Sequence, residues 1–308
     1  MKEKIYFSKS NDCIEVDVTI VNDERNPMVV FTLNKNSKYP MLALYKLVER
    51  YRAMLKNHEA AGRCFITNGR FYHFYPFKKF TYWSFKDITF SNCDFENFRI
   101  DPSVEFSTFI SCSFKKGEFF CCQTIEGCVF ESCSFSNVKF DMNIDYGTIF
   151  DNCEIASCDF NSNIKKSLFK KCNISSVNFW GGKFKDVDFK DCVISDVKFI
   201  KNFLDCVDFS AKCKNLNLSE CDSIKCTTLN GDDVVFMSFG ETFGAINLLL
   251  IGDKVQHNIL SNENYELKLN DFKDFIDSVK KRDDQIFWSK NHYKFLYKTE
   301  KFFKEIAE

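Results

Sequence analysis

Large apolar side chains recur at every fifth position from Trp83 to Phe236, and no other property of the sequence restricts the fold as much. Two residues before most of these centres lies a smaller side chain, usually Cys or Val. An α-helix rotates residues five apart by about 140° and would scatter the centres around its surface, whereas a flat strand needs a period of two. The period fits a chain that turns a corner every five residues and points two of them inward. The longest regular run of centres is Phe169, Ile174, Phe179, Phe184, Phe189, Ile194, Phe199, Leu204 and Phe209.

Four such corners close a square coil of about 20 residues, and coils stack at roughly the 4.8 Å spacing of neighbouring strands. Between Lys185 and Lys198 we expect Val187, Phe189 and Ile194 inside, while the Asp and Lys residues around them face water. The interior is then a column of Phe and Ile side chains lined by Cys and Val.

This pattern resembles the pentapeptide repeat family, and the resemblance covers residues 83–236, about half of the chain. It implies a right-handed quadrilateral β-helix, so the predicted fold class is mainly β, a solenoid with a module at each end. The chain departs from the commonest Ala-Asp/Asn-Leu pattern of the family by using Phe at the centres and Cys or Val at the small positions. We expect roughly seven to eight coils and a rod of about 35 to 38 Å.

Residues 1–82 do not repeat and are predicted to form a small α+β module. Cys13–Val21 and Met28–Leu33 read as strands, and Pro40–Glu59 reads as an amphipathic helix. Cys64–Phe74 contains two short strands around Asn68-Gly69, which predicts a hairpin.

Residues 237–308 are predicted to form a mostly helical capping module. Ala245–Ile251 is a short apolar element that can close the solenoid, and helical patterns cover Asn270–Lys281 and the stretch from Asp284 to the end. A solenoid needs covered ends, because an open end exposes unpaired backbone and apolar rings.

The chain has 16 Cys, and eight of them occupy the small position two residues before a centre. We expect these thiols to pack in the interior rather than to form disulfides or to bind metal. Two groupings resemble zinc ligand sets, but there is no CxxC pair, and Cys residues five apart lie on different faces of a square coil. The eight are Cys93, Cys112, Cys128, Cys133, Cys153, Cys158, Cys172 and Cys192; the two groupings are Cys121-Cys122 with Cys128 and Cys133, and Cys206, Cys213, Cys221 and Cys226.

The sequence carries no recognisable catalytic motif. The four His are dispersed, without an HExxH or Cys-His spacing, and there is neither a P-loop nor a GxGxxG after a strand. We therefore expect no enzymatic activity, no cofactor and no metal.

Net charge and hydropathy indicate which partners and which cell compartment to expect. The 42 Lys and Arg nearly balance the 43 Asp and Glu, which argues against a polybasic nucleic-acid binder. No stretch reaches the roughly 18 apolar residues that span a bilayer, and the first residues lack the apolar core of a signal peptide. We expect a cytoplasmic protein with no membrane contact and no direct nucleic-acid contact.

Two interruptions of the period are candidate features. From Ile100 to Phe109 the step is nine, so the segment with Pro102, Glu105 and Phe106 is predicted to bulge out as a loop, either as a partner contact or as an insertion tolerated at a corner. Asp145 stands at a centre position, where a buried lone carboxylate is costly. Either Ile144 or Tyr146 takes its place through a local bulge, or Asp145 marks a polar site.

Three outward positions are further candidates for partner binding. Trp180 follows a centre and is expected to face solvent, where it either anchors an interface or packs on a neighbouring coil. Glu131 and Asp151 are 20 apart and are predicted to stack, in a half-rod (83–159) with 13 acidic and 5 basic residues. This pair either forms an acidic strip that mimics a nucleic-acid backbone, or lies on a solvated face where nearby Lys170 reduces the repulsion between the two carboxylates.

These observations predict a non-enzymatic solenoid whose rigid surface binds a protein partner as a scaffold, adaptor or inhibitor. The resemblance also implies a bacterial origin and an alternative role, a DNA mimic that protects or inhibits DNA gyrase or another DNA-processing enzyme such as a topoisomerase. A second alternative is a secreted effector with an activity in its flanking modules. A homodimer through a terminal module is a further expectation from the resemblance.

Overall fold

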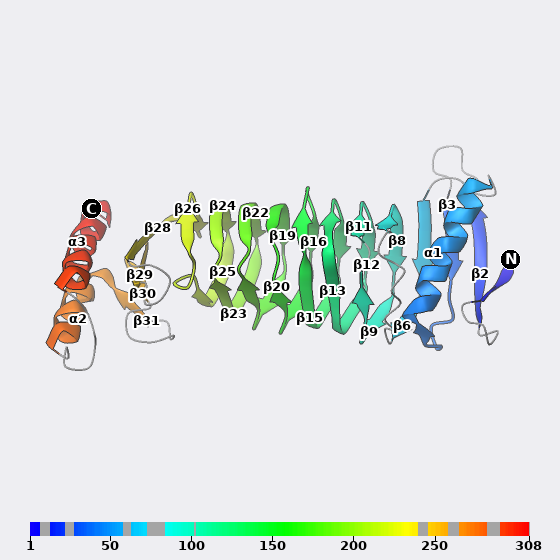
Figure 1. Cartoon of the computed structure of the whole chain (residues 1–308), viewed down its shortest axis with the longest axis horizontal. Coiled ribbons are helices and arrows are strands. Elements are labelled where there is room, and N and C mark those ends of the chain that lie inside the picture. Colours follow the sequence, from blue (N-terminus) through cyan, green and yellow to red (C-terminus); the bar gives the residue numbers. More distant parts are fainter. Residues whose placement is uncertain are drawn as a thin grey trace.

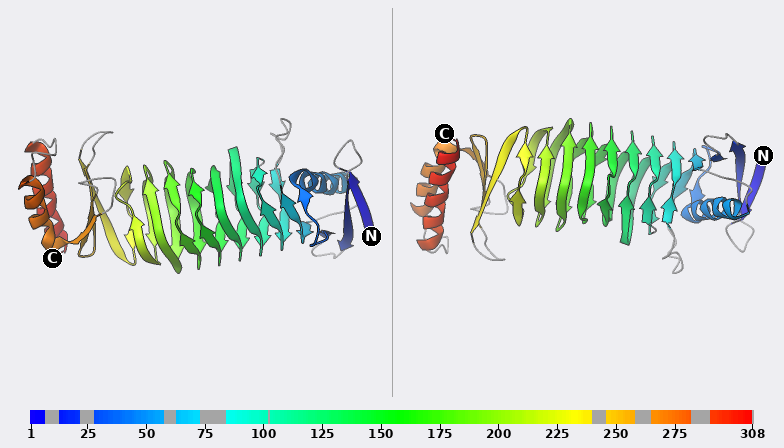
Figure 2. Two further views of the ribbon diagram at one scale, coloured as in Figure 1. Left: turned by 90° about the horizontal axis from the view of Figure 1, so that it is seen from below. Right: turned by 90° about the horizontal axis from the view of Figure 1, so that it is seen from above.

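The computed structural model describes residues 1–6, 13–21, 28–57, 63–72, 84–101, 103–239, 246–257, 265–281 and 290–307. They form a rod whose strands follow one another along the long axis, with the N-terminal module at one end and two helices at the other (Figure 1). The two side views of Figure 2 show the same succession of strands. The chain is thus a mainly β solenoid with a module at each end, as the sequence predicts.

The coils have four faces, which we call A to D in chain order, and strands on each face pair in parallel with the coils before and after. Phe109, for example, pairs with Phe90 and Phe130, so residues 19 to 21 apart lie in register. Several strands continue round a corner and contribute to two faces. Face A holds β8 (Ile88–Ser91), β12 (Thr108–Ile110), β14 (Val129–Glu131), β16 (Ile149–Asp151), the ends of β19 (Ile164–Lys170), β22 (Lys183–Lys190) and β24 (Phe203–Phe209), and β27 (Thr228–Leu229).

The other faces repeat this arrangement. Face B holds β9 (Asp94–Glu96), β17 (Glu154–Ala156), β20 (Asn173–Ser175) and the starts of β13 (Ser113–Glu126), β15 (Ser134–Asp145), β23 (Cys192–Ile200) and β25 (Ala211–Asn217). Face C holds β10 (Arg99–Ile100), β18 (Asp159–Phe160), β21 (Asn178–Trp180) and later parts of β13, β15, β23 and β25. Face D holds β7 (Ser84–Lys86), β11 (Ser103–Glu105), β26 (Ser223–Lys225), the ends of β13 and β15 and the starts of β19, β22 and β24.

Most corners contain a residue in the left-handed backbone region. Asn92, Asn152 and Asp191 are typical, with φ of 52°, 54° and 57°. This conformation costs an L-residue roughly 1–2 kcal/mol, and Asn and Asp tolerate it best. The corner N–H offsets the cost by donating to the next coil, as Asn152 N does to Lys170 O at 2.8 Å.

Phe rings fill the interior in stacked columns. On face A each ring lies 4.7–5.0 Å from the next, with interplanar angles of 10° or less. Offset stacking of this kind adds about 0.5–1.5 kcal/mol per pair to the burial of apolar area. The column consists of Phe90, Phe109, Phe130, Phe150, Phe169, Phe189 and Phe209, all at most 1% exposed.

The eight Cys at the small positions are buried, as predicted. Most of their thiols also donate to backbone carbonyls of the preceding coil, as Cys133 Sγ does to Phe109 O at 3.3 Å and Cys153 Sγ to Phe130 O at 3.2 Å. Ser107 Oγ makes the same bond to Phe85 O at 3.0 Å. The small position therefore accepts compact side chains, and where these are Cys or Ser they can also donate a hydrogen bond.

Two local predictions need correction. The segment from Ile100 to Phe109 is not a bulged loop, because β11 pairs with β7 and β13 and buries Val104 completely. The corner before it is one residue shorter than the usual step of five, as are the corners after Phe140 and Phe160, so Val104 becomes the missing centre. Pro102 lies outside the described residues. At the other interruption Ile144 is the buried centre, one of the two expected replacements for Asp145.

The N-terminal module continues the rod's own sheet. β1 (Lys2–Tyr6), β2 (Cys13–Val21) and β3 (Met28–Thr32) pair antiparallel in that order. β3 also pairs in parallel with β5 (Arg63–Thr67), which in turn pairs in parallel with β8. β4 (Tyr39–Pro40) and β6 (Arg70–Tyr72) likewise lead to β9 on face B.

Helix α1 (Met41–Lys56) covers the end of the interior, where the Tyr45 ring stacks on Phe85 at 5.6 Å. The predicted hairpin at Asn68-Gly69 is wrong, because β5 and β6 pair with different strands. Asn68, with a φ of 60°, forms a coil corner, which needs the same positive φ as a hairpin turn.

At the other end a four-stranded antiparallel sheet closes the last coil. Its strands are β28 (Asp232–Phe239), β29 (Ile246–Ile251), β30 (Lys254–His257) and β31 (Tyr265–Lys268). Asn247 Nδ2 donates to the carbonyls of Ser219 and Cys221 at 2.8 and 3.2 Å, and Leu249 joins the core of the coils.

Leu248 and Leu250, on the opposite side of this sheet, pack on α2 (Leu269–Lys281) and α3 (Lys290–Ala307). The sequence predicts the helices and the apolar strand at the centre, but not the sheet around it.

Candidate functional site

The predicted outward residues lie on separate parts of the rod. Trp180, on face C, is 45% exposed and pairs in register with Ile200, so it faces solvent as expected. Glu131 and Asp151 stack on face A, also as expected. Lys170 Nζ lies 3.1 Å from Asp151 Oδ2, so this pair is partly neutralised.

The corner between faces D and A brings together a larger set. Phe106 and Tyr146 occupy equivalent corner positions two coils apart, with φ of 48° and 50°, and they are 51% and 63% exposed. The residue at this corner in the coil between them is Gly127, with a φ of 58°. A Cβ there would lie 2.7 Å from the Phe106 ring, so glycine leaves room for that ring over the corner.

Carboxylates accompany these aromatic rings. Glu105, Glu126 and Asp145 lie directly in register on β11, β13 and β15, each next to the corner residue. Unpaired like charges at strand spacing destabilise a sheet. We call Glu105, Phe106, Glu126, Gly127, Asp145 and Tyr146 the acidic-aromatic corner.

Lysines flank this corner at both ends. Lys86 Nζ lies 5.6 Å from the Phe106 ring centroid and 3.9 Å from Glu105 Oε2. Lys166 Nζ lies 6.0 Å from the Tyr146 ring. The corner is therefore a short apolar and acidic surface bounded by cations.

Sequence analysis identified Glu105 and Phe106 but missed Glu126, Asp145 and Tyr146 as part of the same surface. The signal that finds them is the register of 19 to 21 residues between coils, which Glu105, Glu126 and Asp145 follow. Treating the segment before Phe109 as a bulged loop removed Glu105 from that register.

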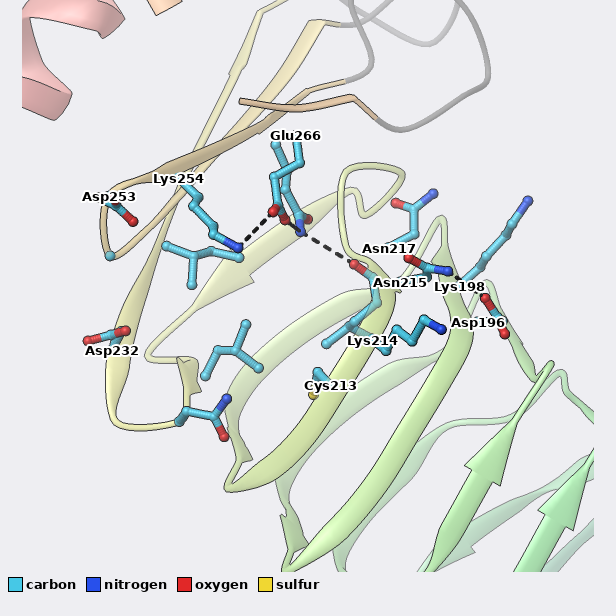
Figure 3. Close-up of a pocket in the computed structure, with 16 residues that line it drawn as sticks. Asp196, Lys198, Cys213, Lys214, Asn215, Asn217, Asp232, Asp253, Lys254 and Glu266 are labelled. Carbon is cyan, nitrogen blue, oxygen red and sulfur yellow. Dashed lines mark hydrogen bonds and ion pairs between the residues drawn. The ribbon is translucent and has the colours of Figure 1, made fainter. Parts of the chain in front are cut away.

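A groove of about 820 Å³ lies between the last coils and the C-terminal sheet. Figure 3 shows Lys254 and Glu266 on the sheet, and Asn215 and Lys198 on the coils opposite them. Its size is that of a small-molecule pocket, but the groove is open, and many charged and amide side chains line it.

Polar groups within the groove largely bind one another. Lys254 Nζ lies 2.9 Å from Glu266 Oε1, and Gln256 Nε2 donates to Glu266 Oε2 at 3.1 Å. Burial raises the pKa of Glu266, but these two hydrogen bonds outweigh it and leave the pKa below its ordinary value. These paired groups lie within the sheet, and Gln256 Nε2 also donates to Leu216 O on the last coils at 3.5 Å.

Metal-ligating side chains converge at one place within the described ranges. Asp205, Cys206 and Cys226 have ligand atoms within 4.8 Å of one another. Burial raises the pKa of interior thiols such as Cys128, to about 12, and Cys158, to about 11, so those remain protonated.

None of the helices in the described ranges has the length and apolar character of a membrane span.

No protein-family model matches the chain, and no curated protein is found similar to it. Among solved structures it is similar to QnrB1, a plasmid-mediated fluoroquinolone resistance protein, at 17% identity over 47% of this chain and 83% of that one, with a TM-score of 0.24. It is similar to HetL, a pentapeptide repeat protein involved in heterocyst differentiation regulation from the cyanobacterium Nostoc sp. strain PCC 7120, at 10% identity over 46% and 87%, with a TM-score of 0.18.

The Agl-KA catalytic domain is similar at 12% identity over 55% of this chain and 47% of that one, with a TM-score of 0.31. These likenesses carry no argument about activity or partner, and the fold rests on the coils themselves. The five-residue motif and the four-sided coil that it builds make this chain a β-solenoid of the pentapeptide repeat type.

Proposed function

We propose that the protein is a non-enzymatic solenoid that binds a protein partner through the acidic-aromatic corner, with Trp180 as a second contact. The observation that carries this proposal is the exposure of Phe106 and Tyr146, 51% and 63%, on a rigid corner beside three carboxylates. Aromatic side chains held without conformational freedom are the usual anchors of protein interfaces.

The physical support comes from rigidity. Phe106 N donates to Glu126 O at 2.8 Å and Gly127 N to Asp145 O at 3.3 Å, so the backbone of the corner is fixed by the coil ladder. A partner therefore loses little affinity to ordering this surface.

A second candidate is mimicry of a nucleic-acid backbone, as an inhibitor or protector of a DNA-processing enzyme. The in-register carboxylates favour it more than Glu131 and Asp151 do. Lys86 pairs with Glu105 as Lys170 pairs with Asp151, but within the described residues no ion pair neutralises Glu126 or Asp145. Binding of this kind depends on long-range charge, so it weakens as ionic strength rises.

The test uses the immobilised full chain to capture proteins from a lysate of its source cells, quantified by mass spectrometry. A specific partner should be captured by the wild type and lost by the Phe106→Ala/Tyr146→Ala double variant, with an affinity loss of about 2 kcal/mol or more. The matched control is Phe203→Ala, because Phe203 is 43% exposed and lies near Lys183 (5.9 Å) much as Phe106 lies near Lys86.

Glu126→Lys then separates the two candidates, measured with the purified partner at two salt concentrations. A loss that disappears at high salt supports the mimic, and a loss confined to the aromatic variants supports the protein anchor. Capture that is equal for the wild type and the double variant contradicts the proposed surface.

A further inference from the structure

Two of the fourteen Cys whose side chains the structure describes are exposed, and these two are neighbours. Cys206 and Cys226 follow Asp205 and Lys225 at the corner between faces D and A, and Asp205 pairs in register with Lys225. The other described thiols are buried or half-buried. Exposed free cysteine is a rare and reactive surface residue, so a stacked pair calls for a chemical reason.

The local backbone fixes the pair. Cys206 and Cys226 have φ of 54° and 46°, so both are corner residues of the same kind on consecutive coils. Lys166 and Asp186 occupy the same corner in the two preceding coils, and Ser132 and Ser176 occupy left-handed corners between other faces, so a corner of this kind has no need of a thiol.

A carboxylate completes the group. Asp205 Oδ1 lies 3.7 Å from Cys206 Sγ, and the ligand atoms of all three residues lie within 4.8 Å of one another. Asp205 also stacks between Lys185 and Lys225 on the neighbouring coils. Within the described residues no ion pair joins it to either lysine, so the carboxylate is directed to the thiols.

The chemistry of the three side chains suits a metal ion. Thiolates and carboxylates are both zinc ligands, and metal binding itself deprotonates the thiols.

We propose that Cys206, Cys226 and Asp205 form a surface site for a thiophilic divalent cation of the zinc type. Zinc binds thiolates at about 2.3 Å and carboxylate oxygen at about 2.0–2.2 Å, so tetrahedral ligands stand about 3.8 Å apart. Exposed side chains reach this separation from 4.8 Å by rotation about χ1 and χ2. Three protein ligands leave a fourth position open to solvent, which water or an external ligand can occupy.

The experiment titrates the reduced full chain with Zn²⁺ against a chromogenic chelator, and with Co²⁺ to observe thiolate-to-metal charge-transfer absorption. We expect one ion per chain, with the affinity reduced tenfold or more in Cys206→Ser and in Cys226→Ser, and less in Asp205→Asn. Serine is compatible with these corners, so circular dichroism melts should match the wild type. Cys213→Ser is the control that removes a nearby half-buried thiol outside the site.

Three results overturn the proposal. One is the absence of stoichiometric Zn²⁺ binding by the reduced chain. Another is binding that persists in the Cys206→Ser/Cys226→Ser double variant, which places the ion elsewhere. The third is a Cys206–Cys226 disulfide in protein purified without exposure to air, detected by mass spectrometry, which makes the pair a redox couple instead.

Discussion

Replacing Phe189 by Ala tests whether the stacked rings hold the rod together. Phe189 is 1% exposed, and its ring lies 4.8 Å from Phe169 and 5.0 Å from Phe209. Removing the ring loses about 2–3 kcal/mol of apolar burial, and each of the two stacked pairs adds about 0.5–1.5 kcal/mol. We expect the free energy of unfolding to fall by about 3 to 5 kcal/mol, as for other truncations of buried aromatic residues.

The neighbouring residue supplies the control. Asp188 points outward in register with Asp208, and partial desolvation and the Asp208 charge raise its pKa. Asp188→Ala should therefore change stability by no more than about 0.5 kcal/mol, in the stabilising direction because a repulsion is removed.

The assay is urea unfolding followed by circular dichroism, with amide hydrogen exchange of residues 169–209 to localise the loss. Exchange matters because a solenoid opens locally, and each coil depends mainly on its neighbours. Similar losses for Phe189→Ala and Asp188→Ala would refute the assignment of inward and outward positions.

Two further predictions concern other parts of the rod. Gly117→Ala should cost roughly 1–3 kcal/mol in urea unfolding, because its Cβ would lie 2.4 Å from the Phe98 ring and 2.5 Å from the Phe98 carbonyl oxygen; an unchanged midpoint would show that the backbone of this coil shifts easily. Burial lowers the pKa of His257 from 6.5 to about 4, so the folded state favours the neutral ring. The stability this contributes is complete above about pH 6.5 and is lost as the pH falls toward 4, by at most about 3 kcal/mol. His257→Gln should flatten that part of the stability–pH curve, and parallel curves would contradict the assignment.

The interior of the rod could be predicted from the sequence because its chemistry repeats. The inward positions carry the same residue types in coil after coil. The period can therefore be recognised despite a local exception, such as the one where Ile144 rather than Asp145 is the buried centre. The error at Val104 arose where the corner is one residue short, and the error at Asn68 arose because a coil corner and a hairpin need the same positive φ. The residues of a single turn do not determine which strand the following segment pairs with.

The surface sites were less predictable, since they depend on which residues stack. Glu126 and Tyr146 join Glu105 and Phe106 only when the short corner and the register between coils are known. For the same reason the sequence groups Cys206 and Cys226 with Cys213 and Cys221, and only the register shows that a spacing of one coil brings the first two together.

The closing contacts at the C-terminal end have a consequence for synthesis. Every coil takes its hydrogen-bond partners from residues 19 to 21 positions away, so a nascent chain can add coils to a finished template as it leaves the ribosome. The last coil formed nevertheless has an unpaired edge until the C-terminal sheet docks on it and Asn247 Nδ2 donates to the carbonyls of Ser219 and Cys221. Self-association competes with folding during that interval, and the speed with which the terminal sheet docks sets the yield of native protein.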